Sequence, residues 1–155
     1  MNQSGGTSRL DRPGDWYLED EVNGYVQGLR VKERLLALQT PFQALQIIDT
    51  EPFGRALILD NALQTTEWDE FMYHEMLVHV PMMTHPGAKS VLIIGGGDGG
   101  ALRRVLEHQQ SEPIQVELDS AVIEACRQYM PGVSAGAYDN PRARVVIGDG
   151  IEYMR

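Results

Sequence analysis

The feature that most constrains the fold is the stretch VLIIGGGDGG, residues 91–100, where four apolar residues lead into five glycines interrupted by one aspartate. A short apolar run is typical of a strand buried in a parallel sheet. Glycines let the backbone turn sharply and let another molecule approach closely. Gly95, Gly97 and Gly100 also have the G-x-G-x-x-G spacing of nucleotide-binding loops between a strand and a helix. The stretch therefore predicts the first strand and the ligand loop of an α/β fold.

The residues after this loop alternate between helical and strand patterns. We expect a helix over 99–108, a strand over 114–118, a helix over 120–129 capped by Ser120, and a strand over 144–147. Strands that alternate with helices predict a parallel, doubly wound sheet. The predicted fold class is α/β: a truncated Rossmann-like, methyltransferase-type parallel sheet over residues 67–155, incomplete at the C-terminus, preceded by a small antiparallel β domain.

The β domain is predicted over residues 16–66, after an N-terminus, 1–15, that we expect to be disordered. Strand-rich stretches at 25–40, 42–50 and 55–61 are separated by Pro41 and by a Pro-Phe-Gly turn. The following stretch, DEFMYHEMLVHVPMM, has helical spacing. The residues that are spaced by three and four are Phe71, Met72, Glu75, Met76 and His79.

Composition excludes several classes of function. The formal net charge of −9 argues against nucleic acid and anionic membranes as partners. No stretch approaches the roughly 20 apolar residues that span a bilayer, and the polar N-terminus does not resemble a signal peptide, so we expect a cytoplasmic protein. Cys126 is the single cysteine, which excludes a disulfide framework, and we expect it to pack in the core. No His, Cys and Asp cluster has metal-ligand spacing, so we expect no metal.

Two carboxylates indicate the kind of ligand. Glu117 follows Gly97 by 20 residues and lies at the end of the second predicted strand, where an acid can accept hydrogen bonds from both ribose hydroxyls. Asp98 would repel a pyrophosphate, since a like-charge contact at 4 Å costs on the order of 4 kcal/mol at an effective dielectric near 20. The ligand is therefore expected to contain adenosine and to be cationic beside the loop, as S-adenosylmethionine and its relatives are.

The motifs resemble one family along nearly the whole chain. The stretches VLIIGGGDGGALRRVLEH, VELDSAVIEACRQYMP and YDNPRARVVIGDGIEYM, with FQALQIID and FGRALILDNALQTTEWDEFMYHEMLVHVPM before them, resemble the spermidine synthases, the polyamine aminopropyltransferases. The resemblance runs from about Trp16 to Arg155. It implies transfer of an aminopropyl group from decarboxylated S-adenosylmethionine to putrescine, which gives spermidine and methylthioadenosine. The donor is a co-substrate, so no cofactor is implied, and a homodimer or homotetramer is expected.

The resemblance also implies roles for single residues. The donor or nucleoside site would contain Gln43, Gly95, Gly97, Asp98, Glu117, Asp149 and Gly150. The polyamine end would contain Gln64, Tyr73, His74 and again Asp98. In this assignment Asp98 holds the amine of the donor, Glu117 the ribose and Asp149 the exocyclic amine of adenine. Without the resemblance, these residues also allow structural roles. Tyr73 and Phe71 could be core aromatics of the helix, and His79 could be a core or surface histidine.

The proton acceptor is not assigned. In the family it is the first aspartate of a D-S/C-S/T-D-P segment on the next strand, which we expect beyond Arg155, so we expect the 155-residue chain alone to be inactive. One alternative is a non-catalytic truncated relative that acts as a binding or assembly protein. Another is an S-adenosylmethionine-dependent methyltransferase, which Asp98 and the β domain disfavour. The sequence does not decide which amine accepts the aminopropyl group: putrescine, cadaverine, spermidine and agmatine each fit.

Overall fold

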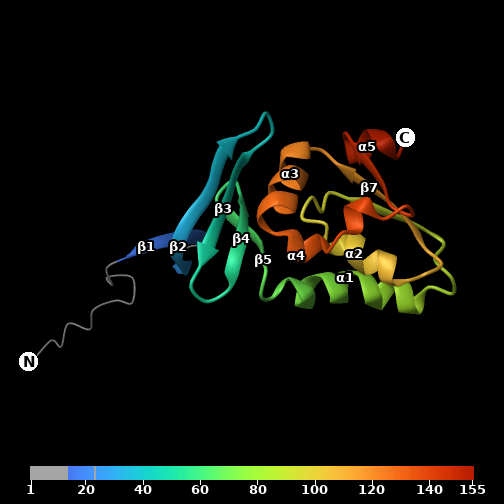
Figure 1. Cartoon of the computed structure of the whole chain (residues 1–155), viewed down its shortest axis with the longest axis horizontal. Coiled ribbons are helices and arrows are strands. Elements are labelled where there is room, and N and C mark those ends of the chain that lie inside the picture. Colours follow the sequence, from blue (N-terminus) through green and yellow to red (C-terminus); the bar gives the residue numbers. More distant parts are fainter. Residues whose placement is uncertain (1–13, 23) are drawn as a thin grey trace, which may run out of the picture.

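The computed structural model of the chain describes residues 14–22 and 24–155. An antiparallel sheet lies at one end of the molecule, and a parallel sheet with helices lies at the other (Figure 1). The predicted fold class is therefore confirmed. The segment expected to be disordered, 1–15, lies outside the described residues except for its last two.

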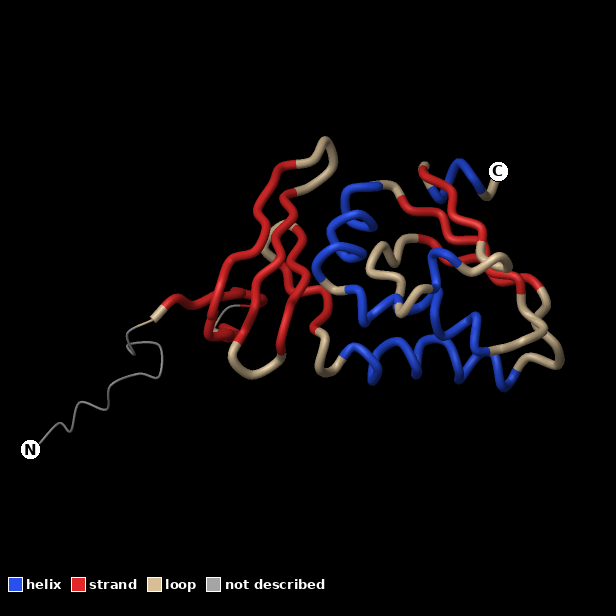
Figure 2. The backbone as a smooth tube through the Cα atoms, viewed as in Figure 1, coloured by secondary structure: helices blue, strands red, loops and turns tan. Residues whose placement is uncertain are grey.

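The antiparallel sheet is a meander in which each strand pairs with the next along the chain (Figure 2). Its strands are β1 (Asp15–Val22), β2 (Tyr25–Gln39), β3 (Ala44–Thr50), β4 (Gly54–Leu59) and β5 (Ala62–Thr66). The stretches that the sequence predicts as strands are β2, β3 and β4, and the structure adds β1 and β5 at the two edges. Consecutive strands joined by short turns form an antiparallel sheet because each turn reverses the chain.

Both faces of this sheet contribute residues to a buried core. Tyr17, Leu29 and Ile48 form a core with neighbouring strands on one face. On the other face Leu45 and Ile47 belong to a cluster that includes residues of the helical half. The sheet therefore shares a core with the helical half, which holds residues of the two halves in fixed positions relative to each other.

The parallel sheet has the strand order β6-β7-β8, with β6 (Ser90–Ile94), β7 (Glu112–Glu117) and β8 (Arg144–Ile147). The elements between and after them are α2 (Gly100–Glu107), α3 (Ser120–Tyr129), α4 (Pro131–Ser134), η2 (Ala137–Asp139) and α5 (Gly150–Tyr153). The predicted bounds of α3 and β8 are confirmed. The predicted cap of α3 is wrong, because Asp119 and not Ser120 accepts a hydrogen bond from the Ala121 N–H.

Helix α1 (Glu70–Thr84) joins the two sheets, and its buried face differs from the apolar pattern of its sequence. The fully buried residues of the helix are Glu70, His74 and Val78, spaced by four. Met72 and Met76, which belong to the predicted stripe, are 51% and 66% exposed. The reason is that Glu70 and His74 find charged partners inside the protein, so a polar face can be buried. Among the described residues no helix is long and apolar enough to cross a membrane.

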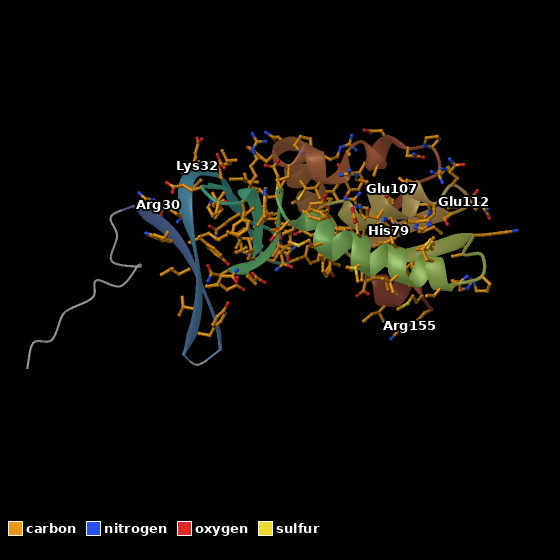
Figure 3. The ribbon with its side chains drawn as sticks, turned by 90° about the horizontal axis from the view of Figure 1, so that it is seen from below. Arg30, Lys32, His79, Glu107, Glu112 and Arg155 are labelled. Carbon is orange, nitrogen blue, oxygen red and sulfur yellow. The ribbon has the colours of Figure 1, made fainter. Side chains whose placement is uncertain are left out.

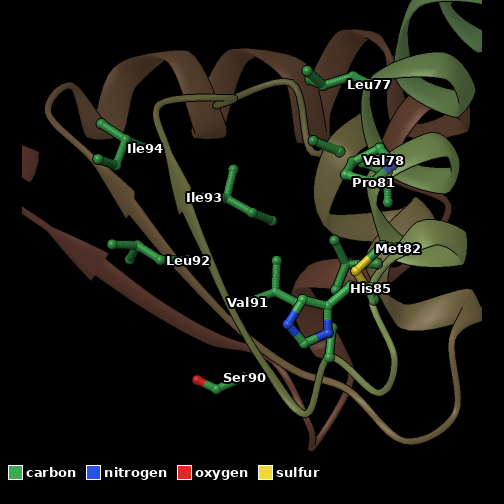
Figure 4. A pocket seen from close by; sticks show the side chains of 13 residues that line it. Leu77, Val78, Pro81, Met82, His85, Ser90, Val91, Leu92, Ile93 and Ile94 are labelled. Atoms are coloured by element: carbon green, nitrogen blue, oxygen red, sulfur yellow. The ribbon is translucent and has the colours of Figure 1, made fainter.

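Strand β6 lies at an edge of the parallel sheet, since among the described strands it pairs with β7 alone. An apolar cavity of about 510 Å³ lies between β6 and helices α1 and α2. Val91 and Ile93 point toward α1, and Leu92 and Ile94 point to the opposite side (Figure 4). Leu92 is 41% exposed and Ile94 54%, so this edge presents apolar side chains to solvent.

Candidate nucleoside and aminopropyl site

The glycine loop turns at the carboxyl end of β6, as the sequence predicts. Gly99 has φ +81°, in the left-handed region that favours glycine. Gly97 is constrained by space instead, because a Cβ there would lie 2.8 Å from Cγ1 of Val122. The close approach of α3 to the loop therefore depends on Gly97.

Two side chains that the sequence analysis did not single out donate hydrogen bonds to the backbone of this loop. Gln115 in β7 is fully buried, and its Nε2 donates to the carbonyls of Gly95 at 2.9 Å and Gly96 at 2.6 Å. The Tyr138 hydroxyl donates to the carbonyl of Gly97 at 2.9 Å. Burial raises the pKa of Tyr138, which keeps its phenol protonated as a donor. A polar residue between the apolar Ile114 and Val116 of β7 is the signal that marks Gln115.

A cavity of about 230 Å³ lies beside the loop, between the two sheets. Six of the residues singled out from the sequence line it, namely Gln43, Gln64, Gly95, Gly97, Asp98 and Glu117. Gln43 and Gln64 come from the antiparallel half, and the other four come from the parallel half. The cavity is therefore built by the packing of the two sheets, with amide groups on one wall and carboxylates on the other.

A second cavity, of about 320 Å³, contains the remaining residues predicted for the nucleoside site. It is lined by Asp149 and Gly150, and it shares Gly95 and Glu117 with the first cavity. Asp149 is exposed and caps α5, because its Oδ1 accepts from the N–H groups of Ile151 and Glu152. Glu117 thus stands at the junction of two cavities, where a ligand with two ends could be held at its middle.

The carboxylate of Glu117 is fixed by its neighbours. Glu117 is 7% exposed, and its Oε1 accepts from the N–H of Asp119 at 3.0 Å. Asp119 in turn accepts at Oδ2 from the Thr40 hydroxyl at 2.7 Å and from Gln43 Nε2 at 3.0 Å. Asp119 was not among the residues singled out, although an aspartate directly before a predicted helix is a strong capping signal. It links Gln43 to the end of strand β7, which carries Glu117.

The carboxylate of Asp98 contacts a buried histidine. Asp98 Oδ1 accepts from the N–H of Gly100 at 2.6 Å and lies 3.2 Å from Nε2 of His74. The opposite ring nitrogen, Nδ1, lies 2.7 Å from Glu70 Oε2. Burial of the imidazole acts to lower the pKa of His74, but the carboxylates of Asp98 and then Glu70 outweigh it, so the pKa is raised.

Family models match both halves of the chain. The model described as the spermine/spermidine synthase domain matches residues 70–155, and the one described as the spermidine synthase tetramerisation domain matches residues 15–67. The chain belongs to the spermine/spermidine synthase family. The resemblance predicted from the sequence is thereby confirmed.

Relatives in this family are similar over most of the chain. Polyamine aminopropyltransferases of Thermoanaerobacter sp. (strain X514) and Methanocaldococcus jannaschii are 51% and 49% identical over 140 residues, which is 90% of this chain and 50% and 47% of theirs. The crystal structure of spermidine synthase from Thermotoga maritima has a TM-score of 0.87 and 46% identity, over 92% of this chain and 50% of that one. A spermidine synthase structure in complex with the transition state analogue AdoDATO gives the same values. The chain spans about half the length of these relatives.

Two residues assigned to the polyamine end by this family resemblance do not line the cavities. Tyr73 is 65% exposed, and its ring meets the His74 ring edge-on with centroids 5.3 Å apart. His74 is 2% exposed and contacts Asp98 from inside the protein, without lining the cavity. The interpretation of Tyr73 and Phe71 as core aromatics is wrong, since Phe71 is also 44% exposed. Of the residues assigned to the polyamine end, Gln64 and Asp98 reach the cavity.

In this chain of the synthase family, neither of these two cavities is lined by His79, His108, Glu107 or Cys126. His79 Nδ1 lies 3.0 Å from His108 Nε2. His79 Nε2 lies 3.3 Å from Glu107 Oε2, and Figure 3 labels both His79 and Glu107. Among the described residues no group of three or more His, Cys, Asp and Glu could hold a metal ion. Cys126 is 1% exposed in the shared core, as expected, and burial raises its pKa, so it stays a thiol.

Proposed function

We propose that this chain binds decarboxylated S-adenosylmethionine and serves the transfer of its aminopropyl group to a diamine such as putrescine, which gives spermidine and methylthioadenosine. The observation that carries the proposal is that Asp98 and Glu117 line one cavity beside the glycine loop. One carboxylate suits the cationic aminopropyl end of the donor, and the other suits the ribose.

The two cavities support one orientation of the donor. With the ribose on Glu117, the adenine extends toward Asp149 and Gly150 in the second cavity, and the aminopropyl chain extends toward Asp98 in the first. Gln43 and Gln64 supply amide groups on the wall contributed by the antiparallel sheet. This arrangement neutralises positive charge on the donor and aligns the carbon that is to be attacked.

Alignment is the main requirement of the reaction. The amine of the acceptor attacks the aminopropyl carbon bonded to sulfur, and the carbon–sulfur bond breaks with its electron pair going to sulfur. The sulfonium thereby becomes a neutral thioether, and the attacking nitrogen loses a proton. Aligning two reactants can lower a barrier by roughly 7–11 kcal/mol. We assign no proton acceptor among the described residues, and we expect the 155-residue chain to show no transfer above background.

The relatives support both the substrate class and self-assembly. The matched proteins are named polyamine aminopropyltransferases, and one solved relative holds the transition state analogue AdoDATO. The model that matches residues 15–67 is described as a tetramerisation domain. We therefore propose that the chain forms a homodimer or homotetramer.

Calorimetry with three ligands tests the proposal. Decarboxylated S-adenosylmethionine and methylthioadenosine should both bind, since both carry the adenosine that Glu117 and Asp149 would recognise. Intact S-adenosylmethionine should bind more weakly than the decarboxylated donor, because its carboxylate would meet Asp98. Tighter binding of the intact compound would favour a methyltransferase. Failure of all three ligands to bind would contradict the proposal.

A further inference from the structure

We propose that Glu70 and His74 form a buried charge relay that positions the Asp98 carboxylate for the amine of the ligand. The ligand in this inference rests on the proposed function, whereas the relay itself is a property of the folded chain. His74 and Glu70 are then positioning residues, because they act through Asp98 and do not line the cavity.

The geometry requires a doubly protonated histidine. Both ring nitrogens of His74 face carboxylate oxygens, at 2.7 Å from Glu70 and 3.2 Å from Asp98. An ionised carboxylate only accepts hydrogen bonds, and a neutral imidazole donates from only one nitrogen. In any neutral tautomer one nitrogen lone pair would therefore face a carboxylate lone pair. The imidazolium form donates to both neighbours and removes this repulsion.

The groups around His74 alternate in charge. Glu70, one turn before His74 on α1, is 7% exposed and bridges to helix α2. Its Oε1 lies 3.4 Å from Arg104 Nη2 and 3.7 Å from Arg103 Nη1. The Tyr73 ring packs against the imidazole in a T-shaped arrangement, with centroids 5.3 Å apart. The order is thus Arg104, Glu70, His74, Asp98, in which every buried charge has a neighbour of opposite sign, as burial requires.

Gly100 gives the relay its space. A Cβ at this position would lie 2.3 Å from both Cε1 and Nδ1 of His74, a distance at which the ring would have to move. The Gly100 N–H also donates to Asp98 Oδ1. The third glycine of the G-x-G-x-x-G pattern therefore leaves space for the His74 ring and helps to hold the Asp98 carboxylate in place.

The two oxygens of the Asp98 carboxylate have different partners. The contacts with Gly100 and His74 are both made by Oδ1, which fixes the rotation of the carboxylate. Oδ2 is then the oxygen that we assign to the ammonium group of the ligand. The carboxylates of Asp98 and then Glu70 raise the pKa of His74, so His74 holds its second proton between them.

The relay can be tested first without any ligand. Nuclear magnetic resonance of the four histidine rings, with His74 assigned from a His74→Gln sample, reports how many protons each ring carries. We expect His74 to carry protons on both nitrogens at pH 7 and to lose one at a higher pH than free histidine does. In Glu70→Gln, an isosteric change, the titration midpoint of His74 should fall. A singly protonated His74 at pH 7, or an unchanged midpoint in the variant, would overturn the relay.

Ligand binding supplies the second test, with Glu75→Gln as the matched control. Glu75 lies on the same helix and also contacts Arg104, at 3.4 Å, but its side chain is 45% exposed, and the ion-pair partners of His74 are Glu70 and Asp98 instead. Glu70→Gln should weaken decarboxylated donor by roughly threefold or more and leave methylthioadenosine, which has no amine, unchanged. Glu75→Gln should affect neither ligand, and Glu70→Asp should restore part of the preference for the donor.

The outcomes separate the relay from the proposed function. Equal weakening of both ligands by Glu70→Gln would mean that Glu70 only maintains the fold, and would overturn its positioning role. If the unaltered chain binds neither ligand, the proposed function fails, and the proton count on His74 still decides the relay. A Gly100→Ala chain that folds and keeps the His74 titration unchanged would contradict the role given to Gly100.

Discussion

The side-chain amide of Gln43 donates to the carboxylate of Asp119 at 3.0 Å, which ties the antiparallel sheet to the first turn of helix α3. The same carboxylate accepts from the Thr40 hydroxyl and caps the helix. Asp119 thereby connects one wall of the cavity to the strand end that carries Glu117.

Replacing Asp119 by alanine should destabilise the protein. The change removes a helix cap, which costs about 1 kcal/mol. It also leaves the hydrogen-bond donors of Thr40 and Gln43 without their acceptor, and an unsatisfied buried donor costs about 1–3 kcal/mol. Urea unfolding should show the free energy of unfolding falling by about 2–4 kcal/mol. Asp139→Ala, which removes a surface ion pair with Arg127, is the control and should change little. Similar losses in the two variants would contradict the role of Asp119.

Asp98→Asn should change selectivity rather than overall binding. The variant keeps the shape of the side chain and loses the charge that would hold the donor's ammonium group. Losing a charged hydrogen bond costs about 1.5–3 kcal/mol, which is roughly tenfold or more in affinity. Calorimetry should show decarboxylated donor weakened by that factor and methylthioadenosine nearly unaffected. Equal losses would show that Asp98 maintains the loop through its contacts with Gly100 and His74.

Glu117→Gln should weaken all ligands that contain a ribose. The variant removes the charge and one set of acceptor lone pairs at the junction of the two cavities. Decarboxylated donor and methylthioadenosine should therefore lose affinity together, by roughly tenfold or more. A deoxy analogue without the ribose hydroxyls should be nearly indifferent to the change. If the analogue weakens as much as its parent, the assignment of Glu117 to the ribose is wrong.

The pH dependence of stability should report His74. Its pKa is raised in the folded protein above the ordinary value of 6.5, so the folded chain holds a proton that the unfolded chain releases. The stabilisation is complete below pH 6.5 and is lost as the pH rises through the folded pKa. The free energy of unfolding of the unaltered chain, minus that of His74→Gln, should therefore decrease with rising pH. A difference that grows with pH would contradict a raised pKa.

The edge at β6 should make the isolated chain associate. A strand that has one unpaired edge and presents apolar side chains is a template for pairing with another chain. Sizing the chain over a concentration series should show larger species as the concentration rises. Leu92→Lys, which places a charge on this edge, should reduce the association, whereas Val26→Lys, at an exposed position of the antiparallel sheet, should leave it unchanged. A monomer independent of concentration would exclude an associating edge.

The local features of the parallel half were predictable from the sequence. Helix α3 and strand β8 have the predicted bounds, because apolar periodicity and short apolar runs act within a few residues, although the cap of α3 is Asp119 and not the predicted Ser120. Helix α1 was also predictable as a helix, but its buried face was not. Apolar spacing favours a face with Met72 and Met76, whereas ion pairs with α2 and the loop bury Glu70 and His74. Periodicity carries no information about partners on other elements.

The sequence by itself determined the glycine loop, the acid within it and the strand end that carries Glu117, since these depend on neighbouring residues and backbone geometry. Only the tertiary structure decided which residues surround that loop. Gln43 and Asp119 are 76 positions apart, and they meet because Leu45 and Ile47 of the sheet pack in one core with Val122 of α3. His74 meets Asp98 because Gly100 leaves room for its ring. Such contacts follow from how side chains of distant elements fill a common interior, which no local pattern specifies.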